Sequence, residues 1–192
     1  MKHLLILLAV AVLLASCHED HSDLIPGQDF IPDEILEEIK ANGQPIFEGL
    51  NPPDVTGRYR VSPMELVSSN FTDNNRPAFF FDEIVDFNGL NQGELTLEVA
   101  SENGGTLGEG FGSFISGSGQ KFTIYVRIDR IDEKGHKTLE TRLYSGTLTD
   151  GGIVNLYTSF FMIDDGGDPD GDSIENGQGR LFKDGNGFSE KM

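Results

Sequence analysis

The sequence predicts an all-β domain, an antiparallel meander of about eight strands that closes into a barrel. Apolar and polar residues alternate along the runs that follow Gly57, turn residues separate these runs, and no segment between them is long enough for a crossover. The 24 glycines and 14 phenylalanines fit a packed core with many tight turns. A two-sheet sandwich would use the same pattern and stays open as the alternative.

Residues 1–16 have the features of a secretory signal peptide. Lys2 and His3 make a short positive start, and the run from Leu4 to Leu14 is wholly apolar. As a helix this run would be roughly 16 Å long, about half of the ~30 Å hydrocarbon core of a bilayer. The segment therefore predicts export rather than a permanent transmembrane span.

Cys17 follows this segment in Leu14-Ala15-Ser16-Cys17, which resembles the lipobox of bacterial lipoproteins. The resemblance implies that Cys17 is acylated and anchors the protein to a membrane. It also accounts for the single cysteine of the chain, since a lone exported thiol can form no internal disulfide. The acidic stretch 18–23 resembles signals that send lipoproteins of Gram-negative bacteria to the outer face of the outer membrane. It could also be a plain solvated tether, or a metal site with His18 and His21 as ligands.

Residues 17–53 are acidic and interrupted by prolines, which predicts a tether rather than regular structure. One short helix is expected over 33–41, because Pro32 suits a helix start and Asn42-Gly43 suits its end. This helix covers one end of the core or acts as a lid. The chain then divides into a signal peptide (1–16), a tether with a helix (17–53) and one barrel domain (54–192).

The clearest strand covers residues 121–131, in which every second residue from Phe122 to Ile128 is apolar. One face of this strand therefore meets a core and the other meets water. Asp150-Gly151 is a strong hairpin signal between the two runs that follow. The expected strands, in chain order, are 57–61, 79–87, 94–100, 109–116, 121–131, 138–148, 153–163 and 179–183.

Gly57-Arg58-Tyr59 at the first strand and Arg180 on the last resemble the pattern of the lipocalin or calycin group. The resemblance implies a calycin-like barrel in which Arg180 packs on Tyr59 at the closed end by a cation–π contact. It also implies an interior that holds a small ligand. The chain differs from that group in having no tryptophan and no helix after the last strand.

The stretch Asp168-Pro169-Asp170-Gly171-Asp172 resembles the calcium loops of repeat proteins. Carboxylates at alternate positions of a glycine-rich loop can surround Ca²⁺, which prefers six to eight oxygen ligands. We expect Asp168, Asp170, Asp172 and Glu175 as candidate calcium ligands. The alternative is a mobile acidic loop that binds no cation.

The net charge of −18 argues against a nucleic-acid partner and against electrostatic docking on anionic lipid. After removal of the signal peptide the chain keeps only His18, His21 and His136, which offers little material for a catalytic triad. Pairs of carboxylates are too numerous to single out a glycosidase site. We therefore expect no enzyme activity.

The expected function is to bind a small apolar or amphipathic molecule inside the barrel, although the same interior could be filled by its own side chains. The residues expected to face inward are Phe79, Phe81, Leu95, Leu97, Phe122, Ile124 and Val126. The alternative is a surface interaction module whose loops bind an envelope glycan or a partner protein. Tyr125, Tyr144 and Phe188 are the aromatic residues expected to be exposed for such contacts.

Overall fold

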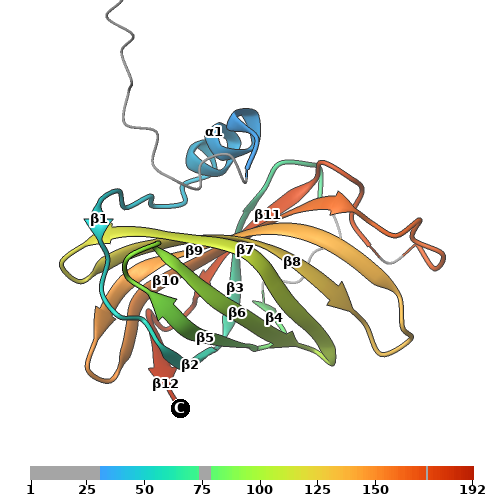
Figure 1. Cartoon of the computed structure of the whole chain (residues 1–192). Helices are drawn as coiled ribbons and strands as arrows, with labels where there is room; N and C mark the ends of the chain where they lie inside the picture. Colours follow the sequence, from blue (N-terminus) through green and yellow to red (C-terminus); the bar gives the residue numbers. More distant parts are fainter. Residues whose placement is uncertain (1–30, 74–78, 172) are drawn as a thin grey trace, which may run out of the picture.

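The computed structural model describes residues 31–73, 79–171 and 173–192 (Figure 1). The signal peptide, Cys17, the stretch 18–23 and Asp172 lie outside the described residues. Within the described ranges, no helix has the length and apolar character needed to cross a membrane. The elements are α1(Asp33–Ala41), β1(Leu50–Asn51), β2(Gly57–Val61), β3(Met64–Ser69), β4(Phe79–Phe80), β5(Glu83–Asn91), β6(Thr96–Asn103), β7(Thr106–Ser118), β8(Lys121–Ile131), β9(Lys137–Thr149), β10(Gly152–Asp164), β11(Gly179–Asp184) and β12(Phe188–Lys191).

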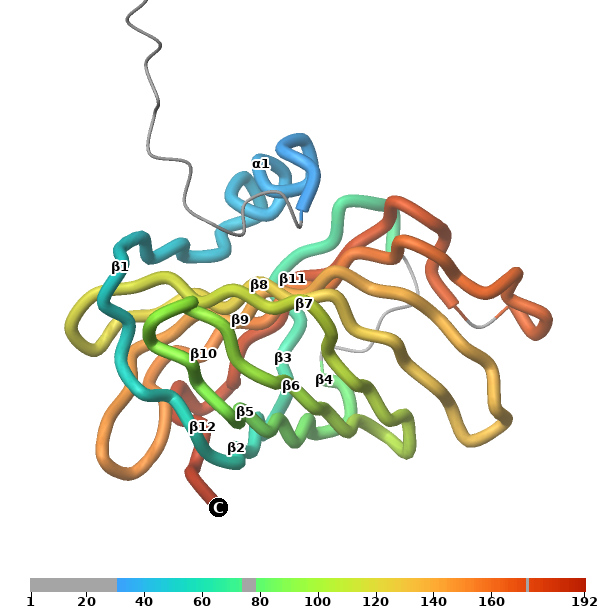
Figure 2. The backbone as a smooth tube through the Cα atoms, viewed as in Figure 1, coloured from blue at the N-terminus to red at the C-terminus, as the bar shows by residue number. Residues whose placement is uncertain are grey.

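The strands form one antiparallel meander that closes on itself (Figure 2). The ring runs β12–β2–β5–β6–β7–β8–β9–β10, and β10 pairs again with β12. It is not a regular barrel, because β10 pairs with β11 over 157–161 and with β12 over 152–154. The sheet therefore continues from β10 along two branches. One branch is β11–β3–β4 and the other is β12–β2–β5. Among the described strands, only β1 pairs in parallel, with β7.

The all-β meander and the single short helix confirm the coarse fold prediction. All described strands belong to one hydrogen-bonded sheet. Each of the eight expected runs overlaps a strand, but the run 79–87 is broken between β4 and β5. The sequence pattern missed the short strands β1, β3 and β12.

Helix α1 occupies the expected residues and lies against the outside of the ring (Figure 1). Asp33 and Glu34 stand in its first turn and Lys40 in its last, as the helix dipole favours. Leu36 and Ile39 are buried on the face toward the sheet. The segment after the helix is held by Gln44, whose Nε2 donates to Ser145 Oγ at 2.7 Å. The segment 44–47 packs on the middle of the outer faces of β8 and β9, where Thr123, Tyr125, Leu143 and Ser145 are buried.

Burial on both faces corrects two predictions about aromatic residues. Tyr125 is 5% exposed and Tyr144 is fully buried, so neither is available for surface contacts. Tyr144 points into the ring, where its side chain meets Phe87 edge to face with ring centroids 5.4 Å apart. Phe188 is exposed as expected.

Leu95, Leu97, Phe122, Ile124 and Val126 are buried in the core, as predicted. The prediction was wrong for Phe79 and Phe81, which are 56% and 74% exposed. These two residues flank the break between β4 and β5, where the strict alternation of faces is lost.

The predicted contact between Arg180 and Tyr59 was also wrong. Lys191 Nζ, not Arg180, lies 5.8 Å from the ring centroid of Tyr59, because Tyr59 is opposite Lys191 in the β2–β12 register. Arg180 lies in β11, opposite Ser69 of β3, toward the other end of the ring. The break between β11 and β12 therefore separates the two residues that the resemblance had brought together.

Candidate functional site

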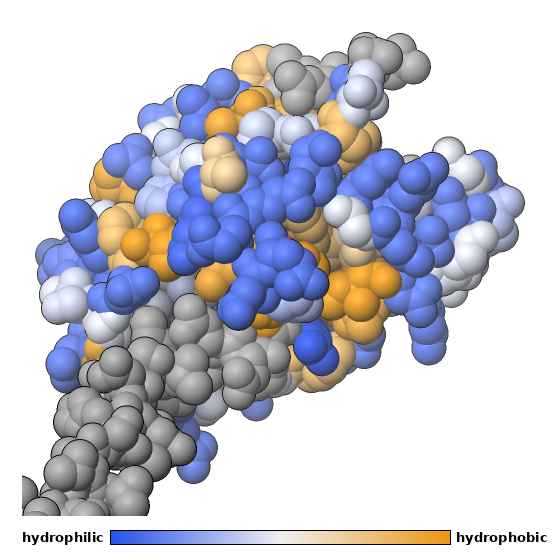
Figure 3. All heavy atoms as spheres, turned by 90° about the horizontal axis from the view of Figure 1, so that it is seen from above, coloured by the Kyte–Doolittle hydropathy of each residue, from blue (hydrophilic) through white to orange (hydrophobic). Residues whose placement is uncertain are grey.

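An open pocket of about 320 Å³ lies at the end of the ring that carries the β8–β9 turn and the β10–β11 loop. We call it the mouth pocket. These two connections run side by side in Figure 2 and form its outer edge. The right-hand end of the molecule in Figure 3, toward which the β10–β11 loop extends in Figure 1, is mostly hydrophilic.

Four charged residues, Glu83, Arg130, Glu140 and Arg142, form an ionic floor inside the ring. Each stands at a position where the strand alternation turns the side chain inward. Arg142 forms an ion pair with Glu83 through Nη1 and donates from Nε to Glu140 Oε2 at 2.9 Å. Glu140 Oε1 is 3.8 Å from Nε of Arg130, so this one carboxylate lies between two guanidiniums.

The two arginines of the floor differ electrostatically. Burial lowers the pKa of Arg142, but Glu83 and Glu140 raise it, and the net result lies well above its ordinary value. Burial and the positive charge of Arg142 together lower the pKa of Arg130. The positive charge of Arg130 is therefore less well balanced by nearby carboxylates than the positive charge of Arg142.

Two buried polar atoms of the floor have no hydrogen-bond partner within the described part of the chain, Nη1 of Arg130 and Oε2 of Glu83. Buried charged groups are costly unless they are fully paired, and an apolar replacement is often as stable or more stable. An ionic floor with incomplete pairing is thus a poor device for stability. Such groups in a hollow are typical of binding or catalytic sites.

The apolar side of the mouth pocket is an aromatic wall made by Phe80, Phe160 and Phe182. Phe160 and Phe182 are stacked with an interplanar angle of 10°, and Phe80 meets Phe182 edge to face at 5.0 Å between centroids. The guanidinium of Arg142 lies 5.5 Å from the ring centroid of Phe160, and that of Arg180 lies 5.2 Å from Phe80. Cation–π contacts at both ends keep the rings in place.

The outer edge carries an acidic lip, which we define as Asp132, Asp165, Asp168 and Asp170. Lys134 Nζ donates to Asp170 Oδ2 at 2.5 Å, and this bond and its charge lower the pKa of Asp170. His136 Nδ1 is 3.4 Å from Asp132 Oδ2 and 3.8 Å from Asp170 Oδ2. The β8–β9 turn and the β10–β11 loop are thereby joined across the lip.

The predicted calcium ligands do not share one place. Asp168 and Asp170 belong to the lip, whereas Glu175 accepts a hydrogen bond from Gln178 at 3.3 Å. Asp172 lies outside the described residues. In the ranges that the structure describes, no three His, Cys, Asp or Glu side chains gather as metal ligands. The calcium site stays a prediction.

Sequence reasoning missed the ionic floor, although the chain carries a signal for it. Arg130 continues the apolar series from Phe122 to Ile128, and Glu140 and Arg142 alternate in the same way with Tyr144. Charged residues in the inward phase of a strand indicate a polar interior.

Comparisons with known proteins add no family: no family model, no curated protein and no solved structure matches this chain. The site must therefore be interpreted from its own geometry. Its arrangement offers an unsatisfied cation, a flat aromatic surface and carboxylates at the entrance, which together suit the binding of a small polar molecule with an apolar part.

Proposed function

We propose that this protein is a bacterial lipoprotein that holds a small amphipathic molecule in the mouth pocket of a calycin-like barrel. It is anchored through acylated Cys17 to the outer membrane of a Gram-negative cell, faces the outside, and binds its ligand without converting it. The ring of eight strands supports the barrel part of this proposal.

One observation carries the binding function. Arg130 is only 7% exposed, lines the mouth pocket, and has a buried Nη1 with no hydrogen-bond partner in the described ranges. A ligand with an acceptor group would remove this deficit, since leaving a buried charged donor unpaired is costly. The aromatic wall beside it suits the apolar part of the same ligand.

The volume of the pocket limits the ligand. A pocket of about 320 Å³ lies at the small end of the range for ligand sites, roughly 300–1,000 Å³. It would hold about ten water molecules at their liquid volume of about 30 Å³ each. The ligand is therefore a compact molecule rather than a long-chain lipid.

The test of binding is native mass spectrometry of the full-length protein extracted from its own membranes. We expect a co-purifying small molecule in the native protein. Thr138→Trp should remove it, because Thr138 lines the pocket and an indole would fill the space. Glu109→Trp, on an exposed position of β7, is the matched control and should keep it. A native protein without adduct, or an adduct retained by Thr138→Trp, would contradict the proposal.

The anchor is tested separately by Cys17→Ser. If Cys17 is acylated, this variant loses the mass of its acyl chains and leaves the outer-membrane fraction, since two or three chains are needed for stable anchoring. Retention in that fraction would show that another segment holds the protein.

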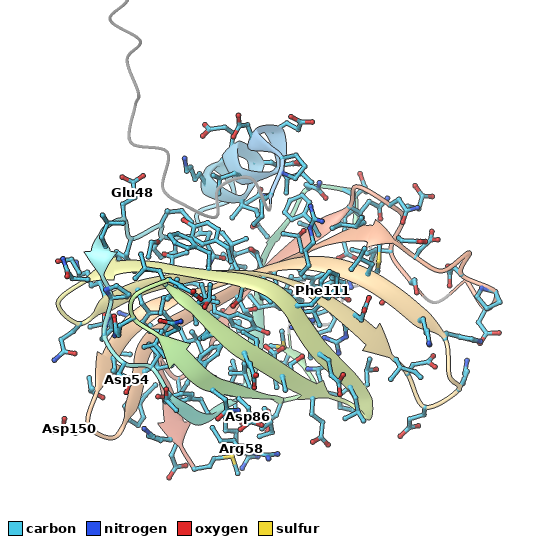
Figure 4. The ribbon with its side chains drawn as sticks, viewed as in Figure 1. Glu48, Asp54, Arg58, Asp86, Phe111 and Asp150 are labelled. Atoms are coloured by element: carbon cyan, nitrogen blue, oxygen red, sulfur yellow. The ribbon has the colours of Figure 1, made fainter. Side chains whose placement is uncertain are left out.

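A second candidate function is a surface interaction module for a glycan or a partner protein. It is favoured by the exposed rings of Phe79, Phe81 and Phe111, of which Phe81 is 74% exposed. Phe111 lies on the outer side of β7 (Figure 4). If these rings bind envelope material, Phe79→Ser with Phe81→Ser abolishes retention on immobilised envelope glycans and leaves the mouth pocket ligand in place.

A further inference from the structure

The charges around the mouth pocket are arranged by depth. The deep side holds Arg130, whose buried Nη1 lacks an acceptor within the described residues, and the entrance holds the carboxylates of the acidic lip. A ligand that enters the pocket therefore meets a guanidinium N–H without an acceptor at its inner end, in a floor whose two arginines and two glutamates balance in charge, and carboxylates at its outer end. The aromatic wall lines the same pocket.

The charges that line the pocket restrict the chemical class of the ligand, in addition to the limit that the pocket volume sets on its size. Five carboxylates and three guanidiniums line the pocket, so its lining is net negative by two charges with His136 neutral. A simple anion would pair with Arg130 but be repelled by the lip. A simple cation would pair with the lip but leave Nη1 of Arg130 without an acceptor. A molecule with both charges satisfies both ends.

We infer that the ligand of the mouth pocket is a small zwitterion with an aromatic or apolar body, of the class to which aromatic amino acids belong. Its carboxylate accepts from Arg130, its ammonium group lies at the acidic lip, and its body lies against Phe160 and Phe182. This inference rests on the proposed binding function and names its ligand class.

The test uses four probes of similar size that share a phenyl ring on a three-carbon chain and differ in the charged groups on that chain: L-phenylalanine, 3-phenylpropionate, 3-phenylpropylamine and 3-phenylpropan-1-ol. Binding to the full-length protein in detergent is measured at pH 7 by titration calorimetry, with empty micelles as the blank. We expect phenylalanine to bind at least about tenfold more tightly than any of the other three, because a hydrogen-bonded charge in a buried site contributes a factor of this order.

Variants assign the two ends of the ligand. Arg130→Gln should weaken phenylalanine and 3-phenylpropionate by about tenfold and leave 3-phenylpropylamine unchanged. Asp168→Asn should weaken phenylalanine by about threefold and leave 3-phenylpropionate no weaker, since the lip is partly exposed and ion pairs in contact with water are modest. Asp150→Asn is the matched control, because Asp150 lies in the β9–β10 turn at the far end of the molecule (Figure 4).

The outcomes separate this inference from the proposed function. Equal affinity of two or more probes, with binding abolished by Thr138→Trp, would overturn the zwitterion and keep the pocket as a binding site. No binding of any probe, together with a native protein that carries no adduct, would overturn both. The ranking of probes on the native protein decides the inference even if Arg130→Gln fails to fold.

Discussion

Replacing Arg142 by methionine is the sharpest perturbation of this fold, because it removes the cation that joins the ionic floor. The side chain is 5% exposed, and its partners Glu83 and Glu140 are 0% and 7% exposed. Methionine keeps an unbranched apolar stem of similar shape but no charge. In Arg142→Met, Glu83 retains only the Tyr144 hydroxyl at 3.3 Å, and Glu140 retains only Arg130 at 3.8 Å.

The expected loss in the free energy of unfolding follows from the burial of these groups. Breaking a buried ion pair by removal of one partner costs about 3–5 kcal/mol. A value of about 4 kcal/mol is a large part of the roughly 5–15 kcal/mol by which a domain is stable. With a slope of about 2 kcal/mol per molar urea, the unfolding midpoint should fall by about 2 M.

The loss of stability in Arg142→Met should depend on pH in a defined direction. In Arg142→Met a buried carboxylate without a counter-charge takes up a proton, which the unfolded chain has released above pH about 4.3. Since the folded variant then binds more protons than the unfolded chain, its stability falls as pH rises. The deficit relative to the native protein is therefore smaller at pH 5 than at pH 8.

Urea unfolding followed by far-ultraviolet circular dichroism measures these values. The double variant Glu83→Gln with Arg142→Met should be more stable than Arg142→Met alone, because the stranded carboxylate is gone. Arg58→Met is the matched control: Arg58 pairs with Asp86 at 3.5 Å on the outer face of β2 and β5 (Figure 4), and its loss should change stability by less than about 0.5 kcal/mol. A deficit for Arg142→Met below about 1 kcal/mol, or no rescue by the double variant, would refute the reasoning.

Three further predictions concern the backbone, the helix and the tyrosines. Gly117→Ala should lower the melting temperature more than Gly119→Ala, because both glycines have positive φ but only at Gly117 would a Cβ collide with backbone, that of Lys121; equal shifts would contradict this. Leu36→Ala with Ile39→Ala should undock α1, seen as fast hydrogen exchange of its amides while β8 stays protected, whereas Glu37→Ala on the exposed side leaves exchange unchanged. Burial raises the pKa of Tyr125 to about 12, above the value of about 10 in the unfolded chain, so the stability that Tyr125 contributes is present below pH 10 and is lost as pH rises toward 12. The free energy of unfolding should therefore fall less steeply with pH in Tyr125→Phe than in the native protein. An unchanged pH profile would show that Tyr125 does not cause the alkaline loss of stability.

Local sequence patterns predicted those features of the fold that are decided by residues close together in the chain. The alternation in 121–131 gave the inner face of β8 correctly, and Pro32 with Asn42-Gly43 delimited α1. These patterns suffice because side-chain direction in a strand and the ends of a helix are decided within a few residues. The same alternation also places the charged residues of the ionic floor at inward positions of their strands. It does not show which of these residues pair with one another.

Sequence distance explains most of the errors. Tyr125 was expected to be exposed because alternation cannot show that the segment after α1, far upstream, packs on the outer side of β8, where Phe47 N–H donates to Thr123 Oγ1. Tyr144 was assigned to the wrong face, since it stands opposite Ile124 and points into the ring. Arg180 was paired with the wrong aromatic residue because the break between β11 and β12 shifts the register of the closing strand.

The sequence by itself determined that the chain forms a meander of antiparallel strands with one short helix, since period and turn residues are local properties. The tertiary structure alone decided how the ring closes and which residues meet at its mouth. Arg130 lies in β8, Glu140 lies in β9, and the acidic lip lies in the β8–β9 turn and the β10–β11 loop. Their approach depends on strand register rather than on spacing. The candidate site is therefore a product of ring closure, which long-range hydrogen-bond registers set and no local pattern encodes.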